Sequence, residues 1–157
     1  ASGDDRRGDT AVEMDVLKEI GHKITEVPSD FALNSKIARQ LKAKREAFDG
    51  GEGIDWATAE ALAFGACAIE KTPVRLSGQD CGRGTFSQRH AVLTDQTTGE
   101  DYVPLQHLRE DQAKVDVLDS PLAEMSVLGF ELHRDKGLLF GFRPWSARKL
   151  GLARRTV

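Results

Sequence analysis

A carboxylate stands where the sequence predicts the start of a helix. The segment reads Asp119-Ser120-Pro121-Leu122-Ala123-Glu124 and continues to Glu131. Ser120 suits an N-cap and Pro121 the first helical position, so we expect Glu124 in the opening turn. A carboxylate held there can accept or relay a proton. The alternative is a surface acid that complements the helix macrodipole.

A glycine-rich polar loop, residues 78–84, is the second place where chemistry can occur. Its glycines can expose backbone donors to an anion such as phosphate. However, no Gly-Lys-Ser/Thr follows as a P-loop requires, and the Gly-x-Gly-x-x-Gly fingerprint is absent. The side chains of Gln79, Asp80 and Arg83 are candidates to line a pocket or a substrate entrance. Alternatively, they are the solvated tips of a turn.

His90 can serve as an acid, a base or a contact for a substrate carboxylate, because imidazole titrates near neutral pH. The alternative is a structural histidine beside a strand. The remaining histidines and both cysteines lack the spacing of metal ligands. These residues are His22, His107, His133, Cys67 and Cys81. The sequence therefore indicates no metal site.

Three helices should precede these residues. Thr10-Ala11-Val12-Glu13 has the form of a capping box, and apolar residues recur at helical spacing from there to Ile24. Asn34 suits the N-cap of a second helix through Phe48, which Gly50-Gly51 ends. Asp55 suits the N-cap of a third helix that runs to about Glu70.

Two helix faces carry specific expectations. The third helix should pack a face of small apolar residues on a sheet, namely Ala59, Leu62, Ala63, Ala66 and Ile69. The second helix should turn its basic residues outward, namely Arg39, Lys42, Lys44 and Arg45. That basic face is either simply solvated or docks the acidic surface of a partner domain.

The strands follow the helices. We expect strands at 74–76 and 114–118, and a hairpin of 90–95 with 101–105 around Thr97-Thr98-Gly99. The strands at 74–76 and 115–117 should be parallel neighbours, with the polar loop and Glu124 meeting at their carboxyl ends. The predicted fold class is α/β, a largely parallel sheet preceded by helices.

Composition limits the function classes. The chain has 157 residues, 39% hydrophobic and 30% charged, which suits one ordinary core. A net charge of −3 argues against nucleic-acid binding by the whole domain. No stretch approaches the roughly 18 apolar residues of a membrane helix. We expect no membrane association and a cytoplasmic location, or the mitochondrial matrix in a eukaryote.

Two stretches carry a resemblance to a known family. Arg75-Leu76-Ser77-Gly78-Gln79-Asp80 with its continuation to His90, and the Ser-Pro-Leu-Ala-Glu frame of Glu124, closely resemble the pyrimidine-binding domain of the thiamin-diphosphate-dependent 2-oxoglutarate dehydrogenase component. The resemblance covers about residues 10–132 and implies a transketolase-like fold. It implies oxidative decarboxylation of 2-oxoglutarate in the tricarboxylic acid cycle. A relative that acts on 2-oxoadipate shares the motifs.

The resemblance also implies cofactors, partners and roles. Thiamin diphosphate and Mg²⁺ are the implied cofactors, and a homodimer partner and a lipoyl-bearing succinyltransferase are the implied partners. Glu124 would be catalytic through a hydrogen bond to the aminopyrimidine ring nitrogen, with Leu122 and Gln79 also binding the cofactor. Asp80, Arg83 and His90 would shape the pocket. The family carries His-Arg-His where this chain has Gln88-Arg89-His90, so one imidazole is missing.

The chain departs from the family in two ways. It has no Gly-Asp-Gly, the run that holds the diphosphate and magnesium in the family, and residues 133–157 follow a different pattern. That tail has seven Lys and Arg against Asp135 alone, and it is either a poorly ordered end or a contact for nucleic acid or an anionic surface.

We divide the chain into a loose end (1–9), a helical lead-in (10–72), a partial pyrimidine-binding domain (73–132) and the basic tail (133–157). Alone, it should bind neither cofactor well and be inactive, because half of the cofactor site is missing. The alternative is a non-catalytic interaction module or an aberrant truncated product.

Overall fold

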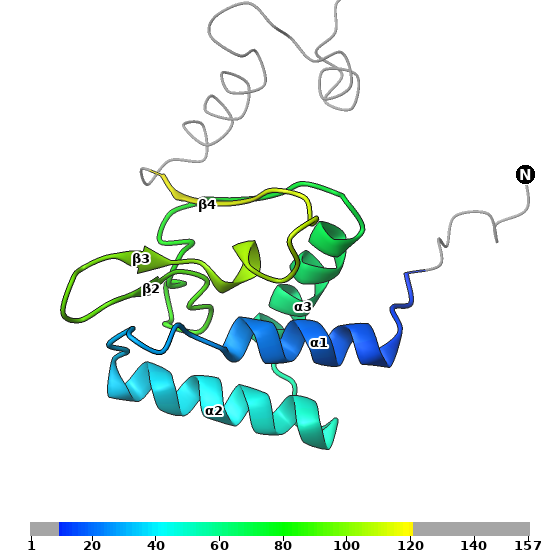
Figure 1. Cartoon of the computed structure of the whole chain (residues 1–157), viewed down its shortest axis with the longest axis horizontal. Helices are drawn as coiled ribbons and strands as arrows, with labels where there is room; N and C mark the ends of the chain where they lie inside the picture. Colours follow the sequence, from blue (N-terminus) through cyan, green and yellow to red (C-terminus); the bar gives the residue numbers. More distant parts are fainter. Residues whose placement is uncertain (1–9, 121–157) are drawn as a thin grey trace, which may run out of the picture.

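A computed structural model describes residues 10–120 of the chain. Its elements are α1 (Met14–Thr25), α2 (Ser35–Gly50), α3 (Trp56–Ile69), β1 (Val74–Gly78), β2 (Leu93–Thr94), β3 (Asp101–Tyr102), the short 3-10 turn η1 (Pro104–Gln106) and β4 (Val115–Asp119) (Figure 1). The predicted helix that contains Leu122 and Glu124, and the basic tail, lie outside the described residues. No helix within 10–120 is both long and apolar enough to cross a membrane.

The predicted capping box at the start of α1 is wrong. The helix begins at Met14, and Glu13 occupies the N-cap position without a side-chain cap. Glu13 has a non-helical ψ of 137°, so it cannot be the N3 residue that a capping box requires. Val12 packs against the core, which holds this stretch in a non-helical path.

The predicted caps of α2 and α3 are confirmed. The Asn34 side chain accepts a hydrogen bond from the Lys36 amide at 2.9 Å, and the Asp55 side chain accepts one from the Thr58 amide at 2.8 Å. Gly51 follows α2 at a φ of +71°, a conformation that glycine adopts without steric cost.

The predicted buried face of α3 is partly wrong. Ala59 and Ala63 are exposed, and the buried positions are Thr58, Leu62, Gly65, Ala66 and Ala68. The reason is close packing at Gly65, where a Cβ atom would lie 2.4 Å from Ile20 Cγ2 on α1. The glycine lets α1 and α3 approach, and that contact decides which side of an alanine-rich helix is buried.

The predicted outward face of α2 is also partly wrong. Arg39 and Lys42 are exposed, but Lys44 and Arg45 are half-buried. The Lys44 ammonium donates to the carbonyl oxygens of Gln88 and Arg89, both at 3.4 Å. Burial lowers the pKa of Lys44.

The predicted parallel strand pair is confirmed. β1 pairs with β4 in parallel, with Val74 opposite Val115 and Gly78 opposite Asp119. The second sheet is a hairpin of β2 and β3, and it is shorter than predicted. Pro104 starts η1 where the hairpin was expected to continue, because proline cannot donate to a strand ladder. The α/β fold class is confirmed.

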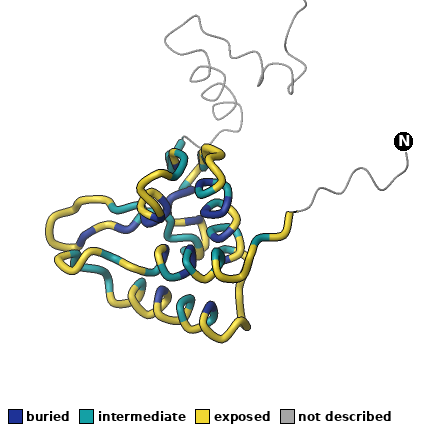
Figure 2. Tube along the Cα trace, turned by 45° about the vertical axis from the view of Figure 1, so that its right-hand side comes forward, coloured by how far each residue is buried: buried dark blue, intermediate teal, exposed yellow. Residues whose placement is uncertain are grey.

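One core joins the helices to the strands. Ile20 of α1, Phe48 of α2 and Leu62 of α3 meet Val115 of β4 in a single buried cluster. Figure 1 shows α1 and α2 side by side and antiparallel, and Figure 2 shows buried positions on all three helices facing the interior. The helical lead-in and the strands therefore share one interior.

The hairpin turn is organised by a buried carboxylate. Asp95 is 5% exposed and accepts hydrogen bonds from the amides of Thr97 (2.6 Å), Thr98 (2.9 Å) and Ala32 (2.7 Å). The donors at Thr98, Ala32 and Thr97 hold the pKa of Asp95 below its usual range. Asp95 thereby fastens the turn to the segment between α1 and α2.

We predict that Gly65→Ala destabilises the fold by about 1–3 kcal/mol, since overpacking outweighs the helix propensity that alanine adds. Urea unfolding measures this. Gly50→Ala is the matched control, because a Cβ there meets nothing within 4 Å. A Gly65→Ala variant as stable as Gly50→Ala would contradict the close approach.

We predict that Asp95→Asn lowers the free energy of unfolding at pH 7 and that the deficit shrinks below about pH 4. The folded pKa is depressed, so the carboxylate stabilises the fold above its unfolded pKa of about 3.9 and loses this effect as the pH falls through the folded value. Urea unfolding across pH 3–7 measures the deficit, with the exposed Asp101→Asn as the control. A deficit that does not change with pH would refute the assignment.

Candidate functional site

The loop that follows β1, residues 79–90, meets the end of β4. The Ser120 amide donates to the Gly78 carbonyl at 2.9 Å, and the Gly82 amide donates to Asp119 Oδ1 at 2.9 Å. The Gly82 amide is the main cause of the lowered pKa of Asp119. The predicted meeting of the loop with the carboxyl ends of the strands is therefore seen for the described residues, and Glu124 lies outside them.

Cys81 attaches the start of this loop to both strands. Its thiol lies 3.1 Å from the carbonyl oxygen of Leu118 on β4 and 3.5 Å from that of Leu76 on β1. The residue is 4% exposed, and burial raises the pKa of the thiol. A protonated thiol can donate to these carbonyls, so Cys81 acts here as a small buried donor.

Three predicted pocket residues lie in the first part of the loop. Gln79 is exposed, and Asp80 forms an ion pair with Arg83 that includes an Nε to Oδ1 hydrogen bond of 3.2 Å. Arg83 and Asp119 line an open hollow of about 360 Å³ together with Gly82, Val92, Thr94, Asp101 and Val117. The structure thus brings Asp80 and Arg83 together at the carboxyl ends of β1 and β4.

Two of the loop glycines use their amides within the protein. The Gly82 amide is used by Asp119, and the Gly84 amide donates to the Asp80 carbonyl at 2.8 Å. Gly84 has a φ of +83°, and a Cβ there would lie 2.6 Å from Gln88 Oε1. These glycines serve a tight turn, so the phosphate interpretation of the loop is wrong for these two amides.

His90 is the last residue of the loop 79–90 and does not line the hollow that Arg83 lines. Its ring lines a small cavity of about 30 Å³ beside Lys44, Glu60 and Arg89, and its Nε2 is buried without a hydrogen-bond partner. Burial lowers the pKa of His90, and the charges of Lys44 and Arg83 act in the same direction. His90 therefore stays neutral over a wider pH range than a free histidine.

The sequence interpretation missed the contact between α3 and the loop. Glu60 accepts two hydrogen bonds from the Arg89 guanidinium, from Nε at 2.5 Å and from Nη2 at 3.2 Å. The two residues are 29 positions apart, and no local motif connects them. Only the packing of α3 under the loop brings them together.

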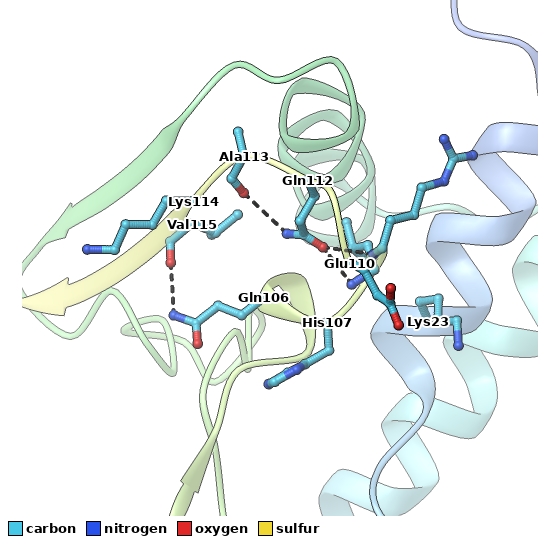
Figure 3. Close-up of a pocket in the computed structure, with 10 residues that line it drawn as sticks. Lys23, Gln106, His107, Glu110, Gln112, Ala113, Lys114 and Val115 are labelled. Carbon is cyan, nitrogen blue, oxygen red and sulfur yellow. Dashed lines mark hydrogen bonds between the residues drawn. The ribbon is translucent and has the colours of Figure 1, made fainter.

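A larger hollow of about 650 Å³ lies at the opposite end of β4 and contains none of the predicted site residues. Figure 3 shows that amide side chains brace its wall. Gln106 Nε2 donates to the Val115 carbonyl at 2.8 Å, and Gln112 Oε1 accepts from the amides of Leu108 and Arg109 at 2.7 and 2.9 Å. Ligands in α/β folds bind at the carboxyl ends of strands, so we place the candidate site at the loop.

Comparisons with known proteins identify the family. The family model for the transketolase pyrimidine binding domain matches residues 52–132. The 2-oxoglutarate dehydrogenase E1 component of Brucella anthropi is 54% identical over 126 residues, which cover 80% of this chain and 13% of the relative. Those of Brucella melitensis biotype 2 and Brucella suis are also 54% identical over 80% of this chain and cover 12% of each relative.

The chain thus spans about an eighth of the length of the curated relatives that it matches. The family match includes α3, both strands of the parallel pair and the loop between them. The chain belongs to the transketolase pyrimidine-binding-domain family.

Proposed function

We propose that this chain provides the aminopyrimidine-binding part of a thiamin-diphosphate-dependent 2-oxoacid dehydrogenase, with 2-oxoglutarate as the substrate. The observation that carries the proposal is the meeting of the loop with the end of β4, through the Ser120 to Gly78 hydrogen bond of 2.9 Å. Leu122 and Glu124 follow Ser120 directly in the sequence. The similarity to 2-oxoglutarate dehydrogenase E1 components supports the choice of substrate.

We propose a role for each predicted site residue. Glu124 would be the catalytic carboxylate that hydrogen-bonds the ring nitrogen, with Leu122 and Gln79 as further cofactor contacts. Asp80 and Arg83 would shape the entrance as a fixed pair, because their charges already compensate each other. His90 would hold the end of the loop, since it lines the small cavity beside Glu60 and Arg89.

The ring end of the cofactor is the part that we propose this chain to hold. When bound, thiamin diphosphate supplies the carbanion chemistry of decarboxylation. No cluster of three His, Cys, Asp or Glu side chains within residues 10–120 could hold a metal ion, and the chain has no Gly-Asp-Gly. By the family resemblance, we propose that another domain of the enzyme holds the diphosphate and Mg²⁺.

The setting follows from the same proposal. A homodimer partner would complete the site, a lipoyl-bearing succinyltransferase would take the product, and the enzyme would act in the tricarboxylic acid cycle in the cytoplasm or the mitochondrial matrix. The other candidate, a non-catalytic interaction module, is distinguished by the thiamin titration below.

We predict that the purified chain shows no turnover of 2-oxoglutarate with thiamin diphosphate, Mg²⁺ and an artificial electron acceptor. Positioning of the cofactor supplies much of the catalysis, and this chain would hold only one end. Measurable turnover would show that the chain contains a complete site.

We predict that thiamin binds the chain weakly and that Glu124→Gln weakens this binding about tenfold. A hydrogen bond to a charged group contributes roughly 1.5–3 kcal/mol, and about 1.4 kcal/mol corresponds to a factor of ten in affinity. Saturation-transfer NMR titrations measure the binding, with the exposed Glu110→Gln as the matched control. Equal binding by the wild type and Glu124→Gln would favour the non-catalytic module.

A further inference from the structure

Arg89 connects three parts of the molecule through one guanidinium. Its Nε and Nη2 donate to the two oxygens of Glu60 on α3, at 2.5 and 3.2 Å. Its Nη1 donates to the carbonyl of Cys81 at 2.9 Å. Every nitrogen of the guanidinium is therefore engaged, and Arg89 joins both ends of the loop to the helix beneath.

The pair is shielded from solvent. The Arg89 side chain is 20% exposed and the Glu60 side chain 34%. Glu60, as the hydrogen-bond acceptor, raises the pKa of Arg89 above its already high value. A two-point arginine–carboxylate contact fixes geometry as well as energy, unlike a single contact between mobile surface chains.

The loop needs such a restraint because its backbone is strained. Asp80, Ser87 and His90 have positive φ values of 50°, 54° and 49°. Residues other than glycine rarely adopt this backbone conformation. It persists only where neighbouring contacts hold it. Two of the three lie within two positions of Arg89.

We propose that Glu60 is the positioning residue of the loop 79–90 and acts through Arg89. The carboxylate orients the guanidinium, the guanidinium holds the Cys81 peptide, and the Cys81 end of the loop stays against β1 and β4. This keeps Asp80 and Arg83 at the carboxyl ends of the strands. The importance of the loop for cofactor access rests on the function proposed above, but its positioning by Glu60 does not.

The test measures local opening by the rate at which Cys81 reacts with a thiol reagent. A Cys67→Ala background leaves Cys81 as the reporter, which is 4% exposed in the closed loop. We expect Glu60→Gln to raise the labelling rate at least tenfold while the melting temperature changes by only a few degrees. Glu60→Asp keeps the carboxylate and should restore much of the protection. Arg89→Lys keeps the positive charge but cannot make the two-point contact with Glu60. In this variant Cys81 should be labelled at an intermediate rate.

Glu19→Gln is the matched control. Glu19 forms the same kind of two-point contact with Arg109, at 2.8 and 2.5 Å, and both side chains are 38–39% exposed. This contact joins α1 to the segment after η1, so its loss should leave Cys81 labelling at the wild-type rate.

Two results would overturn the proposal. One is equal Cys81 labelling in Glu60→Gln and the wild type. The other is an increase in Glu19→Gln as large as that in Glu60→Gln, since labelling would then report general loosening. The assay contains no thiamin, so failure of thiamin binding and failure of loop positioning are read separately.

Discussion

Five register pairs join β1 to β4, from Val74 opposite Val115 to Gly78 opposite Asp119. Because the strands are parallel, their carboxyl ends lie side by side. The chain must therefore leave β1 at this end of the sheet and return to the opposite end before it enters β4. The loop, the hairpin and η1 make up this return path. Val115 is 1% exposed and ties the pair to the helical core. The place of the candidate site is therefore a consequence of strand direction.

The cavity that His90 lines contains two cationic side chains and one carboxylate. The cations are Lys44 and Arg89, and the carboxylate is Glu60. Lys44 is bound to backbone carbonyls instead of a carboxylate, which explains how a half-buried ammonium can lie there. A neutral His90 avoids adding a third positive charge.

The starts of α2 and α3 could be predicted from the sequence because they depend on local contacts. Asn34 and Asp55 mark helix starts because one side chain and one nearby amide suffice to make a cap. The buried side of α3 was not predictable in this way, since alanines occur all around the helix and only the approach of Ile20 to Gly65 selects a face. The strand pair was predicted, but the Glu60–Arg89 contact joins residues 29 positions apart that share no local pattern.

The strand pairing also has a kinetic consequence. Val74 and Val115 are 41 positions apart, so their pairing closes a long segment at an entropic cost of roughly 3 kcal/mol. The contact of α1 with α2 closes a shorter segment, since Gly21 and Phe48 are 27 positions apart, whereas the contact of Ile20 with Gly65 spans 45 positions. The α1–α2 pair can therefore form early in folding, and the α1–α3 contact and the β1–β4 ladder later. The rate of folding is therefore expected to depend on the ladder and on the docking of α3 more than on the α1–α2 pair.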